Sequence, residues 1–236
     1  MLDSVELIEE GVGFGVPIAK YEDKTFFASS AHLSISETDS TVELAKTYLL
    51  DTISRKKLPN GKYFDDGFYT LARKTFQKYY LSKKCLTPLF NKMMELREAA
   101  KIKTEFVKVK PRGTVIVKYQ LQPKGVDIKV DFSDLTLSGC EEVLVLNEQG
   151  SNTFKKYADA NGLALFGAGI GAWDAVSANE ASMLSETAQV GFRLKKHREA
   201  LLYRGWERTK NRFSWAGLSY SLKPNNRTFE YQIELL

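Results

Sequence analysis

The stretch Val126-Asp-Ile-Lys-Val-Asp-Phe132 decides the fold, because apolar and polar side chains alternate along it without interruption. Near the end of the sequence, Phe229-Glu-Tyr-Gln-Ile-Glu-Leu235 repeats the same alternation. Successive side chains of a β-strand point to opposite faces, so each stretch predicts a strand with one buried face and one wet face. Strands of this kind are typical of antiparallel sheets.

Turns on either side of these stretches predict hairpins. Residues 114–121 precede the first stretch and are joined to it by Gln122-Pro-Lys-Gly125. Closer to the N-terminus, residues 12–20 and 25–35 flank the polar turn 21–24, which has the length of a hairpin loop. Further strands are expected at 142–146, 189–194, 200–206 and 212–222.

Two segments are less clear from their pattern. Ser40-Thr-Val-Glu43 reads as a helix capping box, yet residues 41–54 are rich in β-branched and aromatic side chains. We favour a strand there and leave the helix open. A short helix is expected at 151–158.

Residues 64–103 predict helices, because their apolar side chains recur mainly at steps of three and four. Thr87-Pro88 is a good start for a second helix, and the short linker 82–86 should make the two helices antiparallel. The fold class is therefore mainly β: an antiparallel β-sandwich with an inserted α-helical hairpin at about 64–103. We expect one domain over 1–236, with the insertion spanning 60–103.

Positive charge gathers in and around this insertion. Residues 55–112 hold 16 Lys and Arg against five Asp and Glu, a net charge of +11, whereas the whole chain carries +5. A surface bearing Lys74, Lys78, Lys83 and Lys84 could bind the phosphates of a nucleic acid. A solvated helical face that keeps the protein soluble is the simpler explanation.

Composition argues against several classes of protein. Two cysteines and two histidines give no disulfide framework and no zinc-ligand spacing, so we expect neither metal nor cofactor. No apolar run approaches the roughly 20 residues that cross a bilayer. The acidic start, Met1–Glu10, lacks the layout of a signal peptide, and the expected location is the cytoplasm.

Tryptophans lie beside charged residues near the C-terminus, in Arg204-Gly-Trp-Glu-Arg208 and at Trp215. Aromatic faces stack on sugar rings, and neighbouring polar groups fix the orientation of a ligand. The polar pair Asn147-Glu148 directly follows an apolar strand. We therefore expect a cleft lined by Asn147, Glu148, Arg204, Trp206, Glu207, Arg208 and Trp215. The alternative is that the tryptophans are core residues and the polar pair forms a turn.

Many alternating strands with Trp, Arg and Glu on the C-terminal ones resemble the galactose-mutarotase-like β-supersandwich family. The resemblance covers about 104–236 and implies sugar binding, with a histidine and a carboxylate at the ring oxygen of the sugar. If the cleft is catalytic, we expect Glu148 or Glu207 as the acid or base, with His32 as a further candidate. His32 lies in a strand-like run, where a core or surface position is the alternative.

The glycine-rich run Gly167-Ala-Gly-Ile-Gly-Ala172 resembles part of a dinucleotide fingerprint but lacks βαβ surroundings, so a loop or bulge is expected. The leading functional prediction is thus binding, with or without processing, of a carbohydrate or other polar small ligand. Two alternatives stay open. One is a nucleic-acid-binding module, and the other is a structural or assembly protein whose exposed sheet edge pairs with another copy.

Overall fold

The computed structural model describes residues 13–22, 24–37, 42–63, 101–171, 173–186, 190–207 and 215–236. Within these ranges the chain is an antiparallel β protein, as the alternating pattern predicted. Its one helical element there is the short 3-10 turn η2 (Gly167–Ile170). No helix in the described part is long and apolar enough to cross a bilayer.

Fifteen strands make up this fold. In chain order they are β1 (Gly13–Tyr21), β2 (Thr25–Glu37), β3 (Val42–Lys57), β4 (Lys103–Lys108), β5 (Thr114–Gln122), β6 (Gly125–Asp131), β7 (Cys140–Gly150), β8 (Lys156–Asp159), β9 (Ala164–Phe166), β10 (Asp174–Ala175), β11 (Glu180–Leu184), β12 (Gly191–Lys195), β13 (Ala200–Glu207), β14 (Trp215–Leu222) and β15 (Thr228–Leu235).

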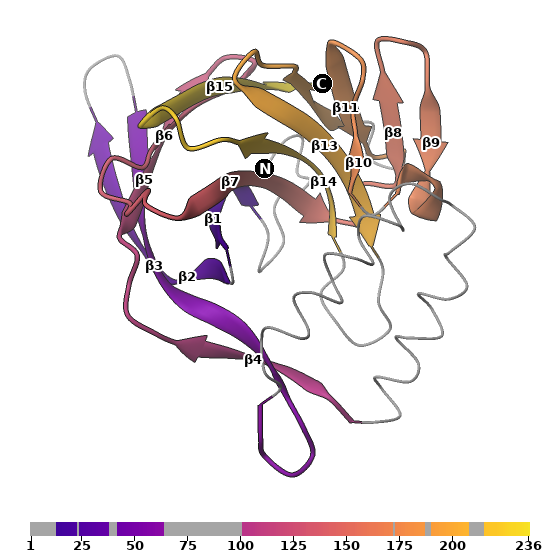
Figure 1. The fold of residues 1–236 in the computed structure, drawn as a ribbon. Coiled ribbons are helices and arrows are strands. Elements are labelled where there is room, and N and C mark those ends of the chain that lie inside the picture. Colours follow the sequence, from indigo (N-terminus) through magenta and orange to yellow (C-terminus); the bar gives the residue numbers. More distant parts are fainter. Residues whose placement is uncertain are drawn as a thin grey trace.

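The strands form a sheet in the order β10-β13-β14-β7-β1-β2-β3-β5-β6-β15-β12-β11-β8-β9, with β4 added beside β3. This sheet folds over on itself, so that β15 and β6 lie above β7 and β14 in Figure 1. Ring contacts join the two layers: Phe14 of β1 meets Phe192 of β12 at 5.2 Å, and Tyr220 of β14 meets Phe229 of β15 at 5.1 Å. The architecture is sandwich-like, with the bend of the sheet at β2 and β3.

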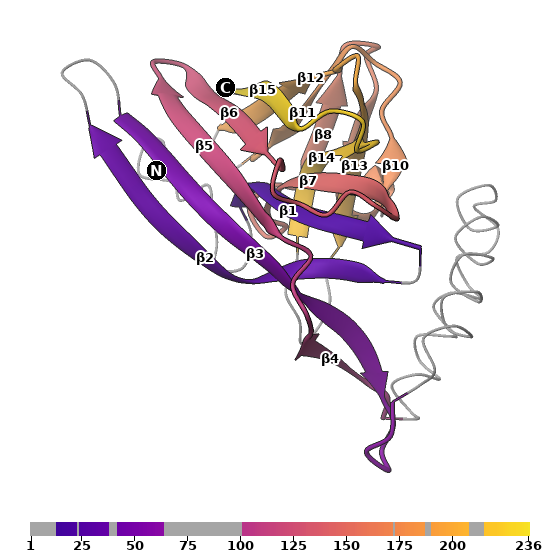
Figure 2. The same cartoon turned by 60° about the vertical axis from the view of Figure 1, so that its left-hand side comes forward.

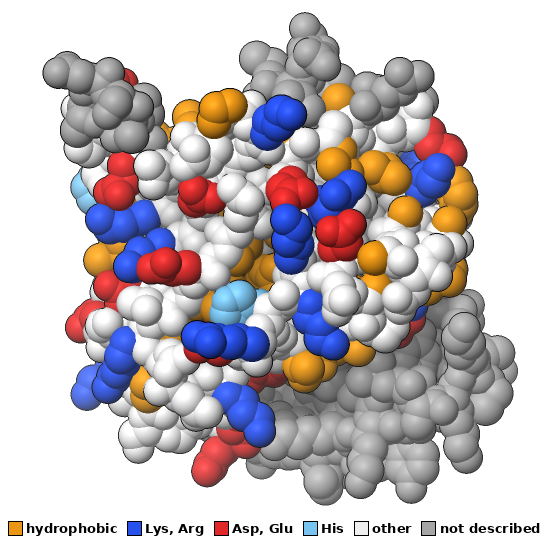
Figure 3. Space-filling model, turned by 90° about the horizontal axis from the view of Figure 1, so that it is seen from above, with side chains coloured by type: hydrophobic (Ala, Val, Ile, Leu, Met, Phe, Trp, Pro, Cys, Tyr) orange, Lys and Arg blue, Asp and Glu red, His pale blue; other side chains and the backbone are white. Residues whose placement is uncertain are grey.

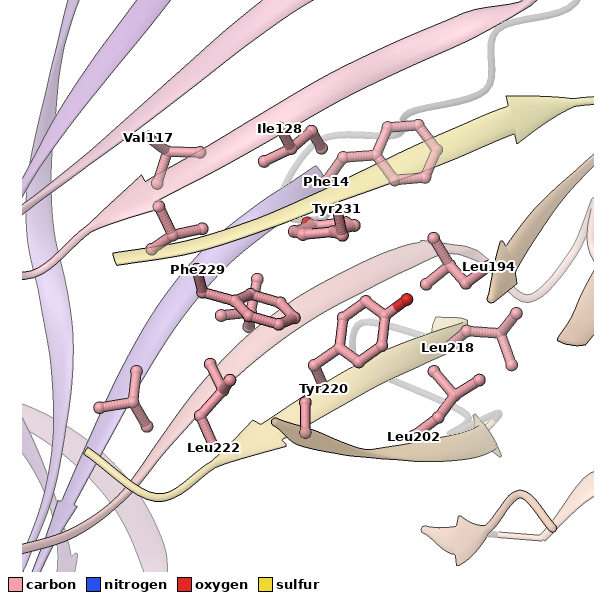
Figure 4. Close-up of a cluster of buried hydrophobic side chains, with 14 of the residues drawn as sticks. Phe14, Val117, Ile128, Leu194, Leu202, Leu218, Tyr220, Leu222, Phe229 and Tyr231 are labelled. Atoms are coloured by element: carbon pink, nitrogen blue, oxygen red, sulfur yellow. The ribbon is translucent and has the colours of Figure 1, made fainter. Parts of the chain in front are cut away.

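The core fills the space between these layers. Apolar side chains from at least six strands converge there, among them those labelled in Figure 4: Phe14, Val117, Ile128, Leu194, Leu202, Leu218, Tyr220, Leu222, Phe229 and Tyr231. Burying a side chain of this size contributes about 2 kcal/mol, so the core dominates the stability of the fold. The polar residues that alternate with these side chains face outward.

A register shift between Phe14 and Val16 lets β1 follow β7 over its whole length. Gly15 lies at the shift with φ of +76°, a backbone conformation that residues with a Cβ rarely adopt. A Cβ on Gly15 would also meet the Val117 side chain at 2.9 Å. Glycine at this position therefore allows the sheet to pack closely over the core.

The pair β2 and β3 extends away from the body of the molecule (Figure 2). β1 pairs with β2 only at Phe26 and Thr25, whereas β2 and β3 stay paired as far as Glu37 and Val42. From Ser29 to Glu37 the residues of β2 are all exposed. The far part of β2 is therefore an extension of the sheet that no second layer covers within the described ranges.

Most predicted strands are confirmed, including 41–54, where the strand interpretation was correct. The helix predicted at 151–158 is wrong: residues 151–153 form a turn and β8 follows. Phe154 and Tyr157 are both buried in the core, and β8 pairs with β9 and β11. Core packing and sheet pairing outweigh the local helical preference of this segment.

The predicted helical hairpin is not confirmed, because residues 64–100 lie outside the described ranges. At its edges the described chain is not helical. Residues 59–60 form a turn, Lys101 has a positive φ of 52°, and Lys103 already begins β4. The described chain is thus already extended at Lys103, the last residue of the predicted insertion.

Candidate functional site

The candidate site lies on the outer face of β7, β14 and β13. Val143, Val145 and Asn147 of β7 are fully buried and face the core, so Glu148 points outward. Pairing places Glu148 opposite Gly217 of β14. On the same outward face, β14 contributes Trp215 and β13 contributes Glu207, which lie opposite each other.

Two carboxylates and three aromatic rings meet on this face. We call Glu148, Glu207, Trp173, Tyr203 and Trp215 the aromatic–carboxylate cluster. The rings of Trp173 and Tyr203 are stacked, with centroids 5.4 Å apart and planes inclined by 10°. Trp173 meets Trp215 edge-on at 6.4 Å, and the Trp215 indole Nε1 donates a hydrogen bond of 3.2 Å to Glu207 Oε2. The indole thus holds one carboxylate beside a ring surface.

Electrostatics distinguish the two carboxylates. Burial of Glu148, together with the negative charge of nearby Glu207, raises the pKa of the Glu148 carboxyl from its usual 4.5 to about 7. Desolvation is the larger cause, because a carboxylate loses solvation when it is enclosed by protein. A carboxyl group with this pKa is partly protonated near neutral pH, so it can both donate and accept a proton.

Glycines flank Glu148 on both neighbouring strands. Gly13 of β1 and Gly217 of β14 lie directly opposite it, and Gly205 of β13 lies opposite Gly217. A Cβ at Gly217 would lie 2.4 Å from the Asn147 carbonyl oxygen, so that position requires glycine. The row of strands around Glu148 therefore has a floor of backbone, with the Glu148 side chain rising from it.

A groove of about 740 Å³ continues from this cluster along the same face. Tyr203 lines it and also belongs to the cluster, and Glu142 of β7 and Ser221 of β14 line it farther along. Glu142 accepts hydrogen bonds from Ser221 Oγ and, at 2.5 Å, from Lys20 Nζ. Burial and the Glu142 carboxylate raise the pKa of Tyr203, which keeps its hydroxyl protonated. Lys223, Asn225 and Asn226 add polar groups at the far end.

The structure separates the residues that the sequence placed in one cleft. Glu148, Glu207 and Trp215 come together on the outer face, but Asn147 faces the core. Asn147 Oδ1 accepts hydrogen bonds from Gly15 N at 3.0 Å and from the Tyr231 hydroxyl at 2.6 Å. Asn147 therefore has a structural role in the core and does not join Glu148 on the outer face.

Trp206 and Arg204 also belong to the inner face, so neither lies in the outer cluster. Trp206 packs against the core, and its Nε1 donates to the Ser151 carbonyl at 3.4 Å. Arg204 Nε donates to the Ile170 carbonyl at 2.9 Å, and its guanidinium lies 5.0 Å from the Tyr157 ring centre. Arg204 thus anchors η2 to the core. η2 belongs to the glycine-rich run, where a loop or bulge was expected.

The remaining candidates do not join the cluster. Arg208 lies outside the described residues. His32 is exposed on the extended part of β2 and pairs with Thr47 of β3, so the structure does not bring it beside Glu148 or Glu207. The structure therefore brings no carboxylate of the aromatic–carboxylate cluster beside His32 for the suggested acid–base role.

The nucleic-acid alternative gains no support in the described part of the chain. Lys74, Lys78, Lys83 and Lys84 lie outside it. Arg112, within the basic stretch, lies 4.6 Å from the Tyr21 ring centre and so packs against the fold. Seen from above, the surface mixes basic and acidic side chains (Figure 3). Ion pairs such as Lys129–Glu230 at 2.6 Å account for part of this mixture.

Sequence reasoning missed Trp173 and Tyr203. The signal for Tyr203 was available, because strict alternation along 200–207 places Leu201, Tyr203, Gly205 and Glu207 on one face. Trp173 had no such signal, since it lies in the loop before the two-residue strand β10. Among the described residues no group of three or more His, Cys, Asp or Glu could hold a metal ion.

Comparison with known proteins gives no family. No family model matches the chain, and no curated protein matches it. Among solved structures, the chain is similar to the α-N-acetylgalactosaminidase NagBb from Bifidobacterium bifidum in complex with GalNAc, with 8% identity and a TM-score of 0.48. The match covers 97% of this chain and 31% of that enzyme. A likeness at this level supports no functional inference, and the galactose-mutarotase-like family is not confirmed.

Proposed function

We propose that the protein binds a carbohydrate or a similar polar, uncharged small ligand on the outer face of β7, β14 and β13. The observation that carries this proposal is the meeting of two carboxylates and three aromatic rings on one face, beside a groove of about 740 Å³. Sugar rings present apolar C–H faces that stack on indole and phenol rings, and their hydroxyls donate to carboxylates.

Each part of the cluster has a role in this proposal. Trp215 and the stacked pair of Trp173 and Tyr203 provide the ring surface. Glu207, held by the Trp215 indole, accepts a hydroxyl of the ligand. Glycines face Glu148 on both neighbouring strands, so no side chain from Gly13 or Gly217 stands beside this carboxyl group.

The sign of the charge favours a neutral ligand. Glu148 and Glu207 lie on the same face, and carboxylates repel phosphates and other anions. If the ligand is also processed, Glu148 is the general acid, because its pKa of about 7 leaves a proton to donate near neutral pH.

Screening against a set of neutral mono- and oligosaccharides, followed by titration calorimetry, tests the proposal. Trp215→Ala and Trp173→Ala should each weaken binding about 10-fold or more, because each removes a stacking surface. Trp206→Phe is the control, because this tryptophan faces the core. The Trp206→Phe variant should bind the ligand as tightly as the wild type. No binding by any neutral sugar, or equal losses in the control, would refute the proposal. Binding only of organic cations would also refute it.

A further inference from the structure

The far part of β2 has a free edge. β1 pairs with β2 only at Ala19–Phe26 and Lys20–Thr25, and beyond this point β3 is its partner within the described ranges. Figure 2 shows this part of β2 along the outer side of the extended hairpin. Its exposed residues leave backbone N–H and C=O groups along that edge available to another strand.

This edge lacks the usual protection against pairing. Thr25–Ser36 contains no charged residue and no proline. The other edges differ: β10 has two residues, β9 has three, and β4 carries Lys103, Glu105 and Lys108. Short or charged edges discourage association, whereas a long uncharged one permits it. Among the described residues, β2 is therefore a long edge strand that lacks the charges of β4 and the short length of β9 and β10.

The apolar face of the sheet also continues uncovered to this edge. One row runs from buried Ile128 through Tyr119 and Leu44 to Ile35, which is 58% exposed. Leu33, on the same face of β2, is 48% exposed. A strand added at β2 would bring side chains beside Leu33 and Ile35 and remove apolar surface from water.

We propose that two copies of this chain associate by antiparallel pairing of their β2 strands about a two-fold axis at Leu33. Residues that face each other in such a pair must lie on the same side of the sheet. In this register Leu33 faces its own copy and Ala31 faces Ile35, so every apolar residue of the run meets another. On the opposite side, His32 faces Ser34.

Neighbouring registers match less well. An axis at Ser34 places Glu37 opposite Ala31, and an axis at His32 places Ile35 opposite Ser29. The axis at Leu33 instead leaves Glu37 opposite Ser29, where the carboxylate stays at the end of the strand. A second copy therefore fits β2 without burying a charge. The two-fold axis uses both edges at once, so the assembly closes as a dimer.

Sedimentation equilibrium on the full chain tests the dimer. We expect a concentration-dependent monomer–dimer equilibrium, and Leu33→Lys should raise the dimer Kd about 100-fold, because it places two ammonium groups at the axis. Leu201→Lys is the control: Leu201 is 58% exposed, compared with 48% for Leu33, but it lies on β13. Far-UV circular dichroism checks that both variants fold. A monomer at every concentration, or equal effects of the two substitutions, would overturn the proposal.

Cysteine cross-linking tests the register, in a background with Cys85 and Cys140 changed to Ser. Facing Cα atoms of antiparallel strands are about 4.5 to 5.5 Å apart, within disulfide reach. Leu33→Cys should therefore cross-link to its own copy under mild oxidation. Ile35→Cys should not, because the two Ile35 positions are about 13 Å apart in this register, but it should cross-link to Ala31→Cys in a mixture. Cross-linking of Ile35→Cys alone would exclude the axis at Leu33. The dimer and the ligand site involve different residues, so failure of one leaves the other standing.

Discussion

The two faces of β7 differ sharply although their residues alternate along one strand. On the inner face Asn147 is fully buried, and its side-chain oxygen accepts two hydrogen bonds from groups of β1 and β15. On the outer face Glu148 has glycines opposite it on both sides and a pKa raised to about 7. The Asn147 side chain completes the hydrogen bonds of its neighbours, whereas the burial of Glu148 lowers the stability of the folded state.

This contrast shows how a polar residue in a strand can be interpreted. A buried polar group whose hydrogen bonds are complete stabilises one arrangement of the core. A carboxyl group that burial keeps partly protonated costs stability, and groups of that kind concentrate at functional sites. The distinction depends on the partners of each residue, which the sequence alone does not reveal.

The largest expected effect is on the inner face. Asn147→Ala leaves the Gly15 N–H and the Tyr231 hydroxyl buried without their acceptor, and each loss costs about 1 to 3 kcal/mol. We expect the free energy of unfolding to fall by about 4 kcal/mol, measured by urea denaturation. A change below about 1 kcal/mol would mean that water replaces the amide, and the contrast between the faces would fail.

On the outer face, Glu148→Gln should instead stabilise the protein. The folded state holds the Glu148 proton more tightly than the unfolded state does, so wild-type stability falls relative to the variant as pH rises from about 4.5 through 7. At pH well above 7 the variant should be more stable by up to about 3 kcal/mol, and at pH near 4 the two should be equal. Denaturation curves at both pH values measure this. A pH-independent difference would contradict the raised pKa.

Arg204→Met tests the inner face again, with a smaller effect. The variant loses the hydrogen bond to the Ile170 carbonyl and the contact with the Tyr157 ring, while keeping much of the packing volume. We expect a loss of about 2 kcal/mol and faster proteolysis near η2. Unchanged ligand binding in this variant would support a structural role of Arg204. Loss of binding in a fully folded variant would instead indicate that Arg204 contacts the ligand.

The smallest effect is expected for Lys20→Met on the outer face. The Lys20–Glu142 ion pair at 2.5 Å is partly exposed, so its removal should cost about 1 kcal/mol or less. Added salt should reduce the difference between variant and wild type, because salt screens exposed charges. A loss as large as that of Asn147→Ala would show that the outer face is also a source of stability.

Much of the fold could be predicted from the sequence because period-two alternation is a local property. It identified the hairpin of β5 and β6 and the strand β15 with nearly correct bounds. The prediction failed at 151–158, where a helix was expected. Tyr157 enters the core there from the four-residue strand β8. Short strands offer too few residues for their period to outweigh local helical preference.

The site could be predicted only in part. Asn147 and Glu148 are neighbours in sequence, as are Trp206 and Glu207, and grouping each pair overlooked that strand neighbours point in opposite directions. The choice between their faces depends on which strand pairs with β7, and β1 and β14 are both distant in sequence. Trp173 joins the cluster through ring contacts with Tyr203 and Trp215, and neither contact has a signal in the sequence.

The pairing of β7 has a consequence for biosynthesis. Its neighbours β1 and β14 lie near opposite ends of the described chain. In the other layer, β6 likewise pairs with β15, which is distant from it in sequence. A ribosome must therefore release the chain through β14 and β15 before the two layers are complete, and distant pairings of this kind fold slowly. During that interval β1 to β3 are already outside the exit tunnel with their apolar face open, so nascent-chain chaperones should meet this protein at its N-terminal hairpin.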